Sequence, residues 1–241
     1  MHLPTGGSFL AVHTTLRRVL VLGKDLEDVL SVVRDHGLEP VQESPEVVIT
    51  YGGDGILLHS EREWPGVPKL PLRNSQRGRK CDPREVREAI AKLARGELVR
   101  REVMKLRLHA KGRTQVGLND VIVHNARPTS SLRCRVFVDD HEFGHEIVGD
   151  GVVMATPFGS TAYYRSITRG IFHLGIGLAF NNSIEQVDHL VLGEEAHIRV
   201  RITRGPAVVV ADNHPEMIAL EEEDEVTVRK DAHAAVILAL V

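Results

Sequence analysis

The sequence has few cysteines, two in 241 residues, which is too few for a disulfide framework. Cys81 and Cys134 could pair with each other, but we expect them to be buried or surface thiols. The first residues also lack the charged stretch and following apolar stretch of a secretory signal. These absences predict a cytoplasmic location.

Long apolar runs are absent as well, since no stretch reaches the roughly 20 residues of a membrane-spanning helix. Neither charge sign dominates, with 30 basic and 33 acidic residues and a formal net charge of −3. We therefore expect neither a membrane nor a nucleic-acid partner. One local basic group alternates with apolar residues, which is typical of the solvent-facing side of a strand. This group is Arg100, Arg101, Lys105 and Arg107.

Several motifs of known chemistry are missing. The 13 histidines form no compact metal-binding spacing, and His141 and His145 flank Gly144 where a hairpin is expected, so we predict no protein-held metal. Ser160 lies outside any Gly-x-Ser-x-Gly elbow, which argues against a hydrolase triad. Neither a P-loop nor a Gly-x-Gly-x-x-Gly motif is present.

What the sequence does contain, in its first third, is an alternation of strand and helix signals. Arg18 to Leu22 is an aliphatic run ended by Gly23, which predicts a buried strand. A helix is expected over 25–36, because its apolar residues share one face and Gly37 stands at the C-cap position. Val47 to Tyr51 predicts a second strand, so the order indicates a parallel α/β sheet.

A further helix is expected from Asp82 as N-cap, with Pro83 at the first helical position, to about Arg95, closed by Gly96. Beyond Gly96, short β-rich runs are separated by turn residues, which indicates an antiparallel β domain. These runs are Val121 to Val123, Cys134 to Val138, His197 to Thr203, Ala207 to Ala211, Val226 to Arg229 and Ala234 to Leu240.

The predicted fold class is therefore α/β plus all-β. Residues 17–96 are expected to form a small Rossmann-like α/β domain. Residues 97–241 are expected to form a larger, β-rich, sandwich-like domain. The last strand could return to the first domain.

The most distinctive local feature is Gly52-Gly53-Asp54-Gly55, directly after a predicted strand. Glycines let the backbone approach a ligand closely, and a helix starting near Ile56 would offer free N–H groups to phosphate oxygens. Asp54 among these donors makes sense if it orients a metal ion or accepts a proton from an attacking hydroxyl. A tight turn with a capping aspartate is the alternative.

Two further polar elements follow. Asp150-Gly151 and Thr156 to Tyr163 flank a predicted strand, and Ser160 and Thr161 are expected to cap the next helix. Their hydroxyls and N–H groups could read a base or ribose, although an ordinary strand–turn–helix junction would look the same. Asn119-Asp120 precedes another strand and could bind a purine amino group or a ribose diol, or form a simple turn.

Together these elements, in this order, resemble the NAD kinase family. That family carries Gly-Gly-Asp-Gly, then an Asn-Glu or similar pair, then Asp-Gly and a Thr-Pro-x-Gly-Ser-Thr-Ala-Tyr stretch. Here they stand at Gly52 to Gly55, Asn119-Asp120, Asp150-Gly151 and Thr156 to Tyr163. The family architecture, a small α/β domain with a β-rich domain, agrees with the one expected above.

The resemblance implies residue roles. Asp54 would act near the acceptor hydroxyl, as base or orienting group, and Gly52, Gly53 and Gly55 would form the phosphate loop. The residues that would bind the dinucleotide are Asn119, Asp120, Asp150, Thr161, Ala162, Tyr163 and Ser166.

The implied reaction transfers phosphate from ATP to the 2'-hydroxyl of the adenosine ribose of NAD, giving NADP, with Mg²⁺ accompanying the ATP. The resemblance also implies a homodimer or homotetramer.

Some positions depart from the family pattern. Ile56 replaces the usual threonine, and Leu70 to Gly78 replaces the family's glycine-rich Leu-Gly-Ile-Asn-x-Gly-x-x-Gly-Phe segment. Arg165 and Arg169 occur where the family tends to have small residues. The new segment is basic, through Arg73, Arg77, Arg79 and Lys80. Two alternatives therefore stay open: a kinase for another acceptor, such as a sugar or nucleotide, and a non-catalytic nucleotide sensor.

Overall fold

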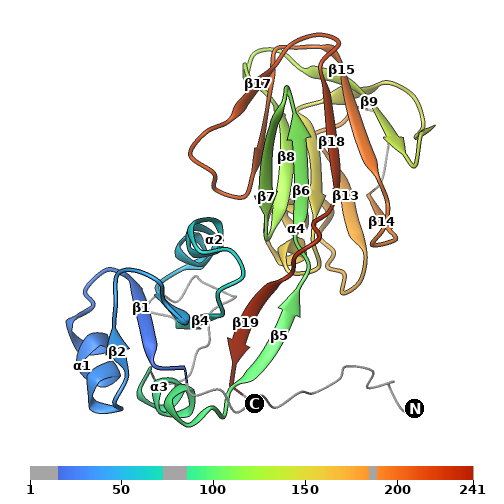
Figure 1. Cartoon of the computed structure of the whole chain (residues 1–241). Helices are drawn as coiled ribbons and strands as arrows, with labels where there is room; N and C mark the ends of the chain where they lie inside the picture. Colours follow the sequence, from blue (N-terminus) through green and yellow to red (C-terminus); the bar gives the residue numbers. More distant parts are fainter. Residues whose placement is uncertain (1–15, 73–85, 185–188, 241) are drawn as a thin grey trace, which may run out of the picture. The chain divides into compact units, whose positions relative to one another are not determined.

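Contacts within the chain divide it into two compact units in the computed structural model, which describes residues 16–72, 86–184 and 189–240 (Figure 1). The α/β unit contains the described residues of 1–57, 67–101 and 236–241, and the β-rich unit contains 58–66 and the described residues of 102–235. Each unit has its own hydrophobic core.

The α/β unit is built on a six-stranded sheet with the order β2-β1-β3-β4-β19-β5. Strands β2, β1, β3, β4 and β19 pair in parallel in that order. The strands are β1 Arg18–Gly23, β2 Glu39–Pro40, β3 Val47–Tyr51, β4 Lys69–Leu72, β5 Val99–Val103 and β19 Ala235–Ala239; the helices are α1 Glu27–Asp35, α2 Asp54–Glu63 and α3 Val86–Arg95.

Local sequence explains these elements. The expected strands at β1 and β3 and the expected helix at α1 are confirmed, with Val29 and Val33 as the buried face of α1. Gly37, with a φ of 73°, follows the end of α1 in the left-handed conformation that favours glycine. A Cβ on Gly23 would lie 2.3 Å from the Tyr51 carbonyl oxygen, so only glycine lets β1 and β3 end this close together.

The strand order places a topological switch at the carboxyl ends of β1 and β3. The chain leaves β1 towards β2 on one side, and leaves β3 towards β4 on the other. Ligands of open α/β sheets bind at such switch points. The Gly52-Gly53-Asp54-Gly55 loop follows β3 and therefore lies at this point.

The boundaries of the α/β unit differ from the predicted ones. The sequence placed the junction at 96/97, whereas the contacts divide the chain inside β5, which pairs with β19 in the sheet. In addition, residues 58–66 group with the β-rich unit. Several positions named from the sequence lie outside the described residues. They are the expected capping residues Asp82 and Pro83, the thiol Cys81 and the basic segment 73–80.

The β-rich unit consists of two sheets. A seven-stranded sheet has the order β10-β9-β15-β18-β6-β7, with β11 also paired to β9, and a six-stranded sheet has the order β14-β13-β12-β8-β16-β17. The first contains β6 Leu106–Ala110, β7 Arg113–Gly117, β9 Leu132–Val138, β10 His141–Glu142, β11 Ile147–Gly149, β15 Ile198–Arg204 and β18 Glu225–Lys230. The second contains β8 Asp120–Asn125, β12 Gly151–Ala155, β13 Ile176–Asn181, β14 Leu190–Leu192, β16 Ala207–Ala211 and β17 Ile218–Leu220.

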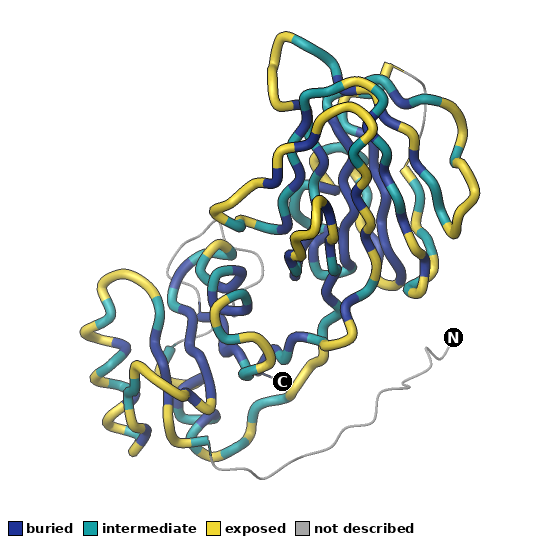
Figure 2. The backbone as a smooth tube through the Cα atoms, turned by 45° about the horizontal axis from the view of Figure 1, so that its top comes forward, coloured by how far each residue is buried: buried dark blue, intermediate teal, exposed yellow. Residues whose placement is uncertain are grey.

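Alternating burial along the strands shows how these sheets pack (Figure 2). Leu106 and Leu108 of β6 are fully buried, while Arg107 between them faces outward. One core cluster takes its residues from both sheets, including Val123 and Met154 of the second. This is the aligned arrangement of a β-sandwich, and the expected fold class is confirmed.

Cys134 is a buried thiol in this core, as expected, and the described residues hold no other cysteine. Burial raises the pKa of its thiol to about 12, so the group stays neutral and unreactive.

One expectation from the basic group 100–107 is wrong. Arg100 and Arg101 are exposed, but Lys105 is 4% exposed, because it enters the interior to pair with Glu61. A buried ammonium group is stable only when paired, and the alternation of residues could not reveal its partner 44 positions away. None of the helices in the described ranges has the length and apolar character needed to cross a membrane.

Candidate functional site

The glycine loop after β3 leads directly into helix α2. The helix begins at Asp54, two residues before the expected start near Ile56. The Gly52 N–H donates to the Leu72 carbonyl at 2.9 Å, which ties the loop to β4. Asp54 is half-buried in the first turn of α2, where a carboxylate is favoured by the helix dipole.

The Asn119-Asp120 pair is held by its backbone. The Asp212 carboxylate accepts the N–H groups of Leu118 at 2.6 Å, Asn119 at 2.7 Å and Asp120 at 3.1 Å. Asn119 and Asp120 are themselves about 95% buried. Sequence reasoning missed Asp212, which showed only as a polar residue between an apolar run and a turn.

We expect Asp212→Asn to lower the free energy of unfolding by about 1–3 kcal/mol, because its amide N–H₂ would face one of the three backbone donors. Urea denaturation followed by circular dichroism measures this change. Glu222→Gln, in an exposed turn, is the control and should unfold like the wild type. An unchanged midpoint for Asp212→Asn would show that the three hydrogen bonds do not hold the Asn119-Asp120 backbone.

The Thr156 to Gly159 turn packs against Asn119. The Thr156 N–H donates to the Asn119 carbonyl at 2.8 Å, and the Thr156 hydroxyl donates to the Leu118 carbonyl at 2.7 Å. The Gly159 N–H donates back to that hydroxyl oxygen at 2.9 Å. A Cβ on Gly159 would lie 1.8 Å from the Asn119 carbonyl oxygen, so no other residue fits. The structure thus brings two of the three sequence elements together.

The expectation that Ser160 and Thr161 cap the next helix is wrong. Gly159–Thr161 form a 3₁₀ turn, and the Ser160 hydroxyl donates to the Pro157 carbonyl at 2.7 Å. Helix α4, Tyr163–Thr168, starts after Ala162 without a side-chain cap. The extra 3₁₀ turn separates both hydroxyls from the first turn of α4. Ser166 is exposed, and its hydroxyl donates to the Tyr163 carbonyl at 2.7 Å.

Tyr163 lies within electrostatic reach of two candidate carboxylates. Burial raises the pKa of its phenol, and the negative charges of Asp150 and Asp120 raise it further. The phenol oxygen accepts a hydrogen bond from the Asn181 amide at 2.9 Å. Tyr163 therefore stays protonated at neutral pH, with its O–H free to donate to a ligand oxygen.

Asp150 sits between β11 and β12, where neighbouring amides orient it. Asn182 donates to one carboxylate oxygen at 2.7 Å, and Asn125 approaches the other at 3.4 Å. A Cβ on Gly151 would lie 2.2 Å from the Val123 carbonyl oxygen, so the glycine after Asp150 serves the packing of β12 on β8. The register of β8 and β12 places Asp120 beside Ala155 and Asp150 beside Asn125, five positions apart along the strands, and Tyr163 is within electrostatic range of both carboxylates. We refer to these three residues, Asp120, Asp150 and Tyr163, as the polar cluster of the β-rich unit.

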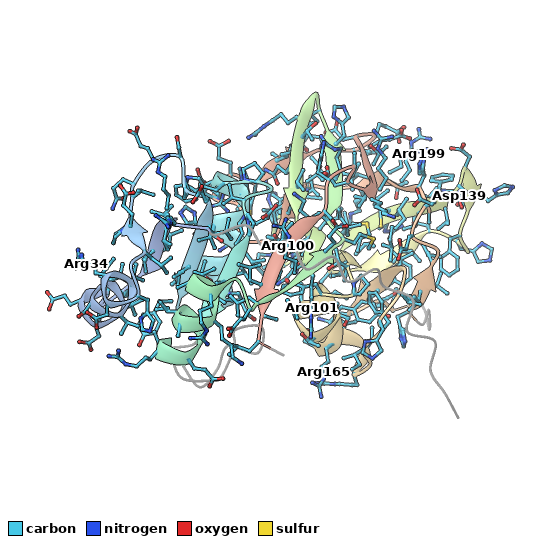
Figure 3. The ribbon with its side chains drawn as sticks, turned by 60° about the horizontal axis from the view of Figure 1, so that its bottom comes forward. Arg34, Arg100, Arg101, Asp139, Arg165 and Arg199 are labelled. Atoms are coloured by element: carbon cyan, nitrogen blue, oxygen red, sulfur yellow. The ribbon has the colours of Figure 1, made fainter. Side chains whose placement is uncertain are left out.

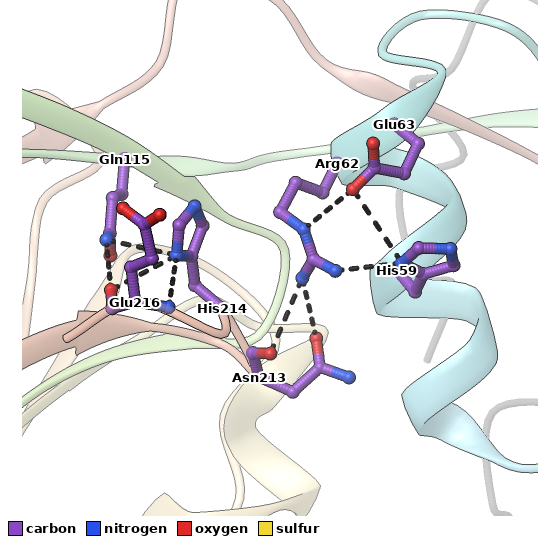
Figure 4. A network of polar contacts seen from close by, with 7 residues as sticks. All are labelled: His59, Arg62, Glu63, Gln115, Asn213, His214 and Glu216. Carbon is purple, nitrogen blue, oxygen red and sulfur yellow. Dashed lines mark hydrogen bonds and ion pairs between the residues drawn. The ribbon is translucent and has the colours of Figure 1, made fainter.

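A cavity of about 540 Å³ in the β-rich unit has Asp212 in its wall. Part of its wall is the second half of α2, where the ammonium of Lys105 lies 2.7 Å from the Glu61 carboxylate. Arg62 donates to the Asn213 side chain at 3.2 Å and contacts His59 at 2.8 Å, while Gln115 donates to the Glu216 carbonyl at 2.7 Å (Figure 4). The volume falls in the range of ligand sites, and the lining offers both donors and acceptors.

Within the described ranges, no group of three or more His, Cys, Asp or Glu side chains is placed to hold a metal ion. Mg²⁺ commonly binds through one or two carboxylates together with substrate phosphates. The single carboxylate of Asp54 beside a phosphate-type loop is compatible with that manner of binding.

Comparisons with known proteins agree with this geometry. A protein-family model described as the ATP-NAD kinase C-terminal domain matches residues 118–240, about half of the chain. An NAD kinase of Marinobacter nauticus is 32% identical over 162 residues, which cover 61% of this chain and 54% of that protein. An NAD kinase of Methanothermobacter thermautotrophicus is 29% identical over 223 residues, covering 87% of this chain and 77% of that protein.

Two solved structures share the fold. A yeast NADH kinase in complex with NADH superposes with a TM-score of 0.82 and 18% identity, over 95% of this chain and 85% of that one. An Archaeoglobus fulgidus NAD kinase in complex with ATP has a TM-score of 0.78 and 19% identity, over 92% and 93%. At the level of the family, the expectation of a kinase-type phosphotransferase is confirmed. From the family match and the named relatives, the chain belongs to the NAD kinase family.

Proposed function

We propose that this protein transfers a phosphoryl group from ATP to the 2'-hydroxyl of the adenosine ribose of NAD, producing NADP. The observation that carries the proposal is that Tyr163, at the start of α4, lies within electrostatic range of both Asp120 and Asp150, in a chain that belongs to the NAD kinase family. The relatives crystallised with NADH and with ATP support these two ligand types.

Each residue of the cluster has a role suited to its chemistry. The Asp120 and Asp150 carboxylates can accept hydrogen bonds from ribose hydroxyls or a purine amino group. Tyr163 can donate its phenol proton to a ligand oxygen, because its raised pKa keeps the group neutral. Asn119 offers an amide from a backbone that Asp212 and Thr156 hold in place. Thr161, Ala162 and Ser166 complete the proposed dinucleotide site from the adjoining turn and helix.

Asp54 is the proposed catalytic residue, as base for the acceptor hydroxyl or as the group that orients it. Gly52, Gly53 and Gly55 leave room for phosphate oxygens near the amino end of α2. Mg²⁺, when bound with ATP, would neutralise phosphate charge, and Asp54 would be its protein ligand. Phosphoryl transfer depends mainly on such positioning and charge stabilisation.

We expect Asp54→Asn to reduce NADP formation by a factor of about 10²–10⁴, the usual contribution of a positioned base. The assay supplies ATP and Mg²⁺ with NAD or NADH and measures NADP or NADPH. Asp28→Asn is the matched control, since Asp28 is also an acidic residue in the first turn of a helix but is exposed. Full activity of Asp54→Asn would contradict the role of this carboxylate.

The departures at Ile56 and over Leu70 to Gly78 favour testing a second candidate, a kinase for another acceptor. The same assay therefore includes sugars and nucleotides. ADP release that depends on one of these acceptors, without NADP, would replace NAD as the acceptor. Nucleotide binding without turnover of any acceptor would favour a sensor. A cytoplasmic location and a homodimer or homotetramer stay predictions, and sedimentation tests the assembly.

A further inference from the structure

A second cavity, of about 460 Å³, opens on the outer face of the seven-stranded sheet. Its wall comes from strands β6, β7, β15 and β18, from the residue before β15 and from the turn after β9. The ionisable side chains of this wall are three arginines, two histidines and one carboxylate: Arg107, Arg199, Arg229, His109, His197 and Asp140. The cavity shares Arg107 and Thr114 with the 540 Å³ cavity, but its lining includes none of the candidate dinucleotide residues Asn119, Asp120, Asp150 and Tyr163.

The strand register places like charges opposite each other. Arg229 of β18 pairs directly with Arg107 of β6, and the next outward-facing position of β18, Thr227, pairs with Arg199 of β15. Directly opposed side chains on one face of a sheet have Cβ atoms about 5 Å apart, and like charges there are destabilising. An anion bound between the two guanidinium groups would offset their repulsion.

The three guanidinium groups differ in their counter-ions. Arg107 lies 2.6 Å from Asp231, which is buried behind it. Arg199, labelled in Figure 3, is 2.8 Å from Glu225, and its guanidinium carbon lies 4.0 Å from the centre of the Phe137 ring. Arg229 is exposed, and within the described residues no carboxylate lies within ion-pairing distance of it. Arg229 is therefore the cation that a ligand would neutralise.

We propose that this cavity binds a small oligophosphate anion, with Arg229 and Arg199 as its main contacts. Guanidinium groups match phosphate geometry because they donate parallel N–H bonds, and Thr114 and Thr227 add neutral hydroxyls to the same wall. The groups stand on paired strands, so the site is preorganised. This inference assigns a second ligand site, outside the proposed catalytic function.

Titration of the full-length protein with inorganic tripolyphosphate, by calorimetry at low salt, tests the proposal. Arg229→Gln is expected to weaken binding at this site by about tenfold or more, the loss of one charge-assisted contact. Arg204→Gln removes the same charge from the end of β15, outside the cavity lining, and should bind like the wild type. Arg229→Gln should lower the affinity of this site and leave the affinity of any phosphate site at the glycine loop unchanged, which separates the two.

Thermal unfolding supplies an independent readout. Without ligand, Arg229→Gln should melt at the same or a higher temperature, because one of two facing like charges is gone. Tripolyphosphate should raise the melting temperature of the wild type and of Arg204→Gln more than that of Arg229→Gln. If Arg229→Gln and Arg204→Gln reduced the tripolyphosphate-induced rise in melting temperature equally, the anion would be attracted by diffuse surface charge and the proposed site would be refuted. Arg229-dependent binding of a short DNA duplex without affinity for tripolyphosphate would overturn it in favour of a nucleic-acid surface.

Discussion

Replacing Lys105 with methionine is expected to lower the free energy of unfolding by about 3–5 kcal/mol, because it breaks a buried ion pair by removing the ammonium group that lies against the Glu61 carboxylate. The side chains of Lys105 and Glu61 are each 5% exposed, and their charged atoms lie 2.7 Å apart. The Gly66 N–H, at 3.4 Å, is a weak additional donor to the same carboxylate oxygen. Water cannot replace the lost ammonium at this depth. Urea denaturation of the single variant measures the loss.

The double variant Glu61→Leu with Lys105→Met separates an ion pair from simple packing. The stability lost in the double variant should be smaller than the sum of the losses in the two single variants, because the two charged groups interact directly across 2.7 Å. Arg95→Met is the control, because its partner Glu97 is at the surface and the pair is exposed. A double variant as unstable as the sum of the singles would contradict the coupling of Glu61 to Lys105.

Replacing Gly159 with alanine is expected to destabilise the β-rich unit by about 1–3 kcal/mol or more, as overpacking of a rigid interior does. The added methyl carbon would lie 1.8 Å from the Asn119 carbonyl oxygen, which is backbone and cannot turn aside. The turn must therefore move away from Asn119 and lose the Thr156 hydrogen bonds to Leu118 and Asn119. Thermal unfolding measures the first effect, and calorimetric titration with NAD measures the displacement of Asn119.

Gly193→Ala is the matched control, because a Cβ at Gly193 meets nothing within 4 Å and its backbone conformation is open to alanine. It should retain wild-type stability and NAD binding. If Gly159→Ala were stable but unable to bind NAD, the glycine would serve a ligand and not the packing against Asn119. If it kept both properties, the close approach of the two segments would be refuted.

Local patterns predicted the α/β unit well, because its signals are short-range. The aliphatic run of β1, the helical face of α1 and the β-branched run of β3 each identify one element without reference to distant residues. Several strands of the sandwich were not predicted, among them β13, Ile176–Asn181. The glycine and alanine of β13 lower its β propensity, and this run becomes a strand because it pairs with β12.

The glycines of the candidate site were only partly understood from sequence. The polar stretch that contains Gly151 and Gly159 predicted ligand contacts, but these two glycines are in close contact with the backbones at Val123 and Asn119. Their neighbours in space are about 30 and 40 residues away in the chain. The packing role of these glycines could therefore not be predicted from the sequence.

The sequence by itself determined the family resemblance, the fold class and the candidate residues Asp54, Asn119, Asp120 and Asp150, because short motifs and hydrophobic periods are local properties. Only the tertiary structure decided that Asp212 holds the Asn119-Asp120 backbone and that Lys105 is buried. It likewise decided that Arg107 and Arg229 oppose each other. Each of these facts depends on strand register and long-range pairing, in which packing energy joins residues about 40 to 120 positions apart.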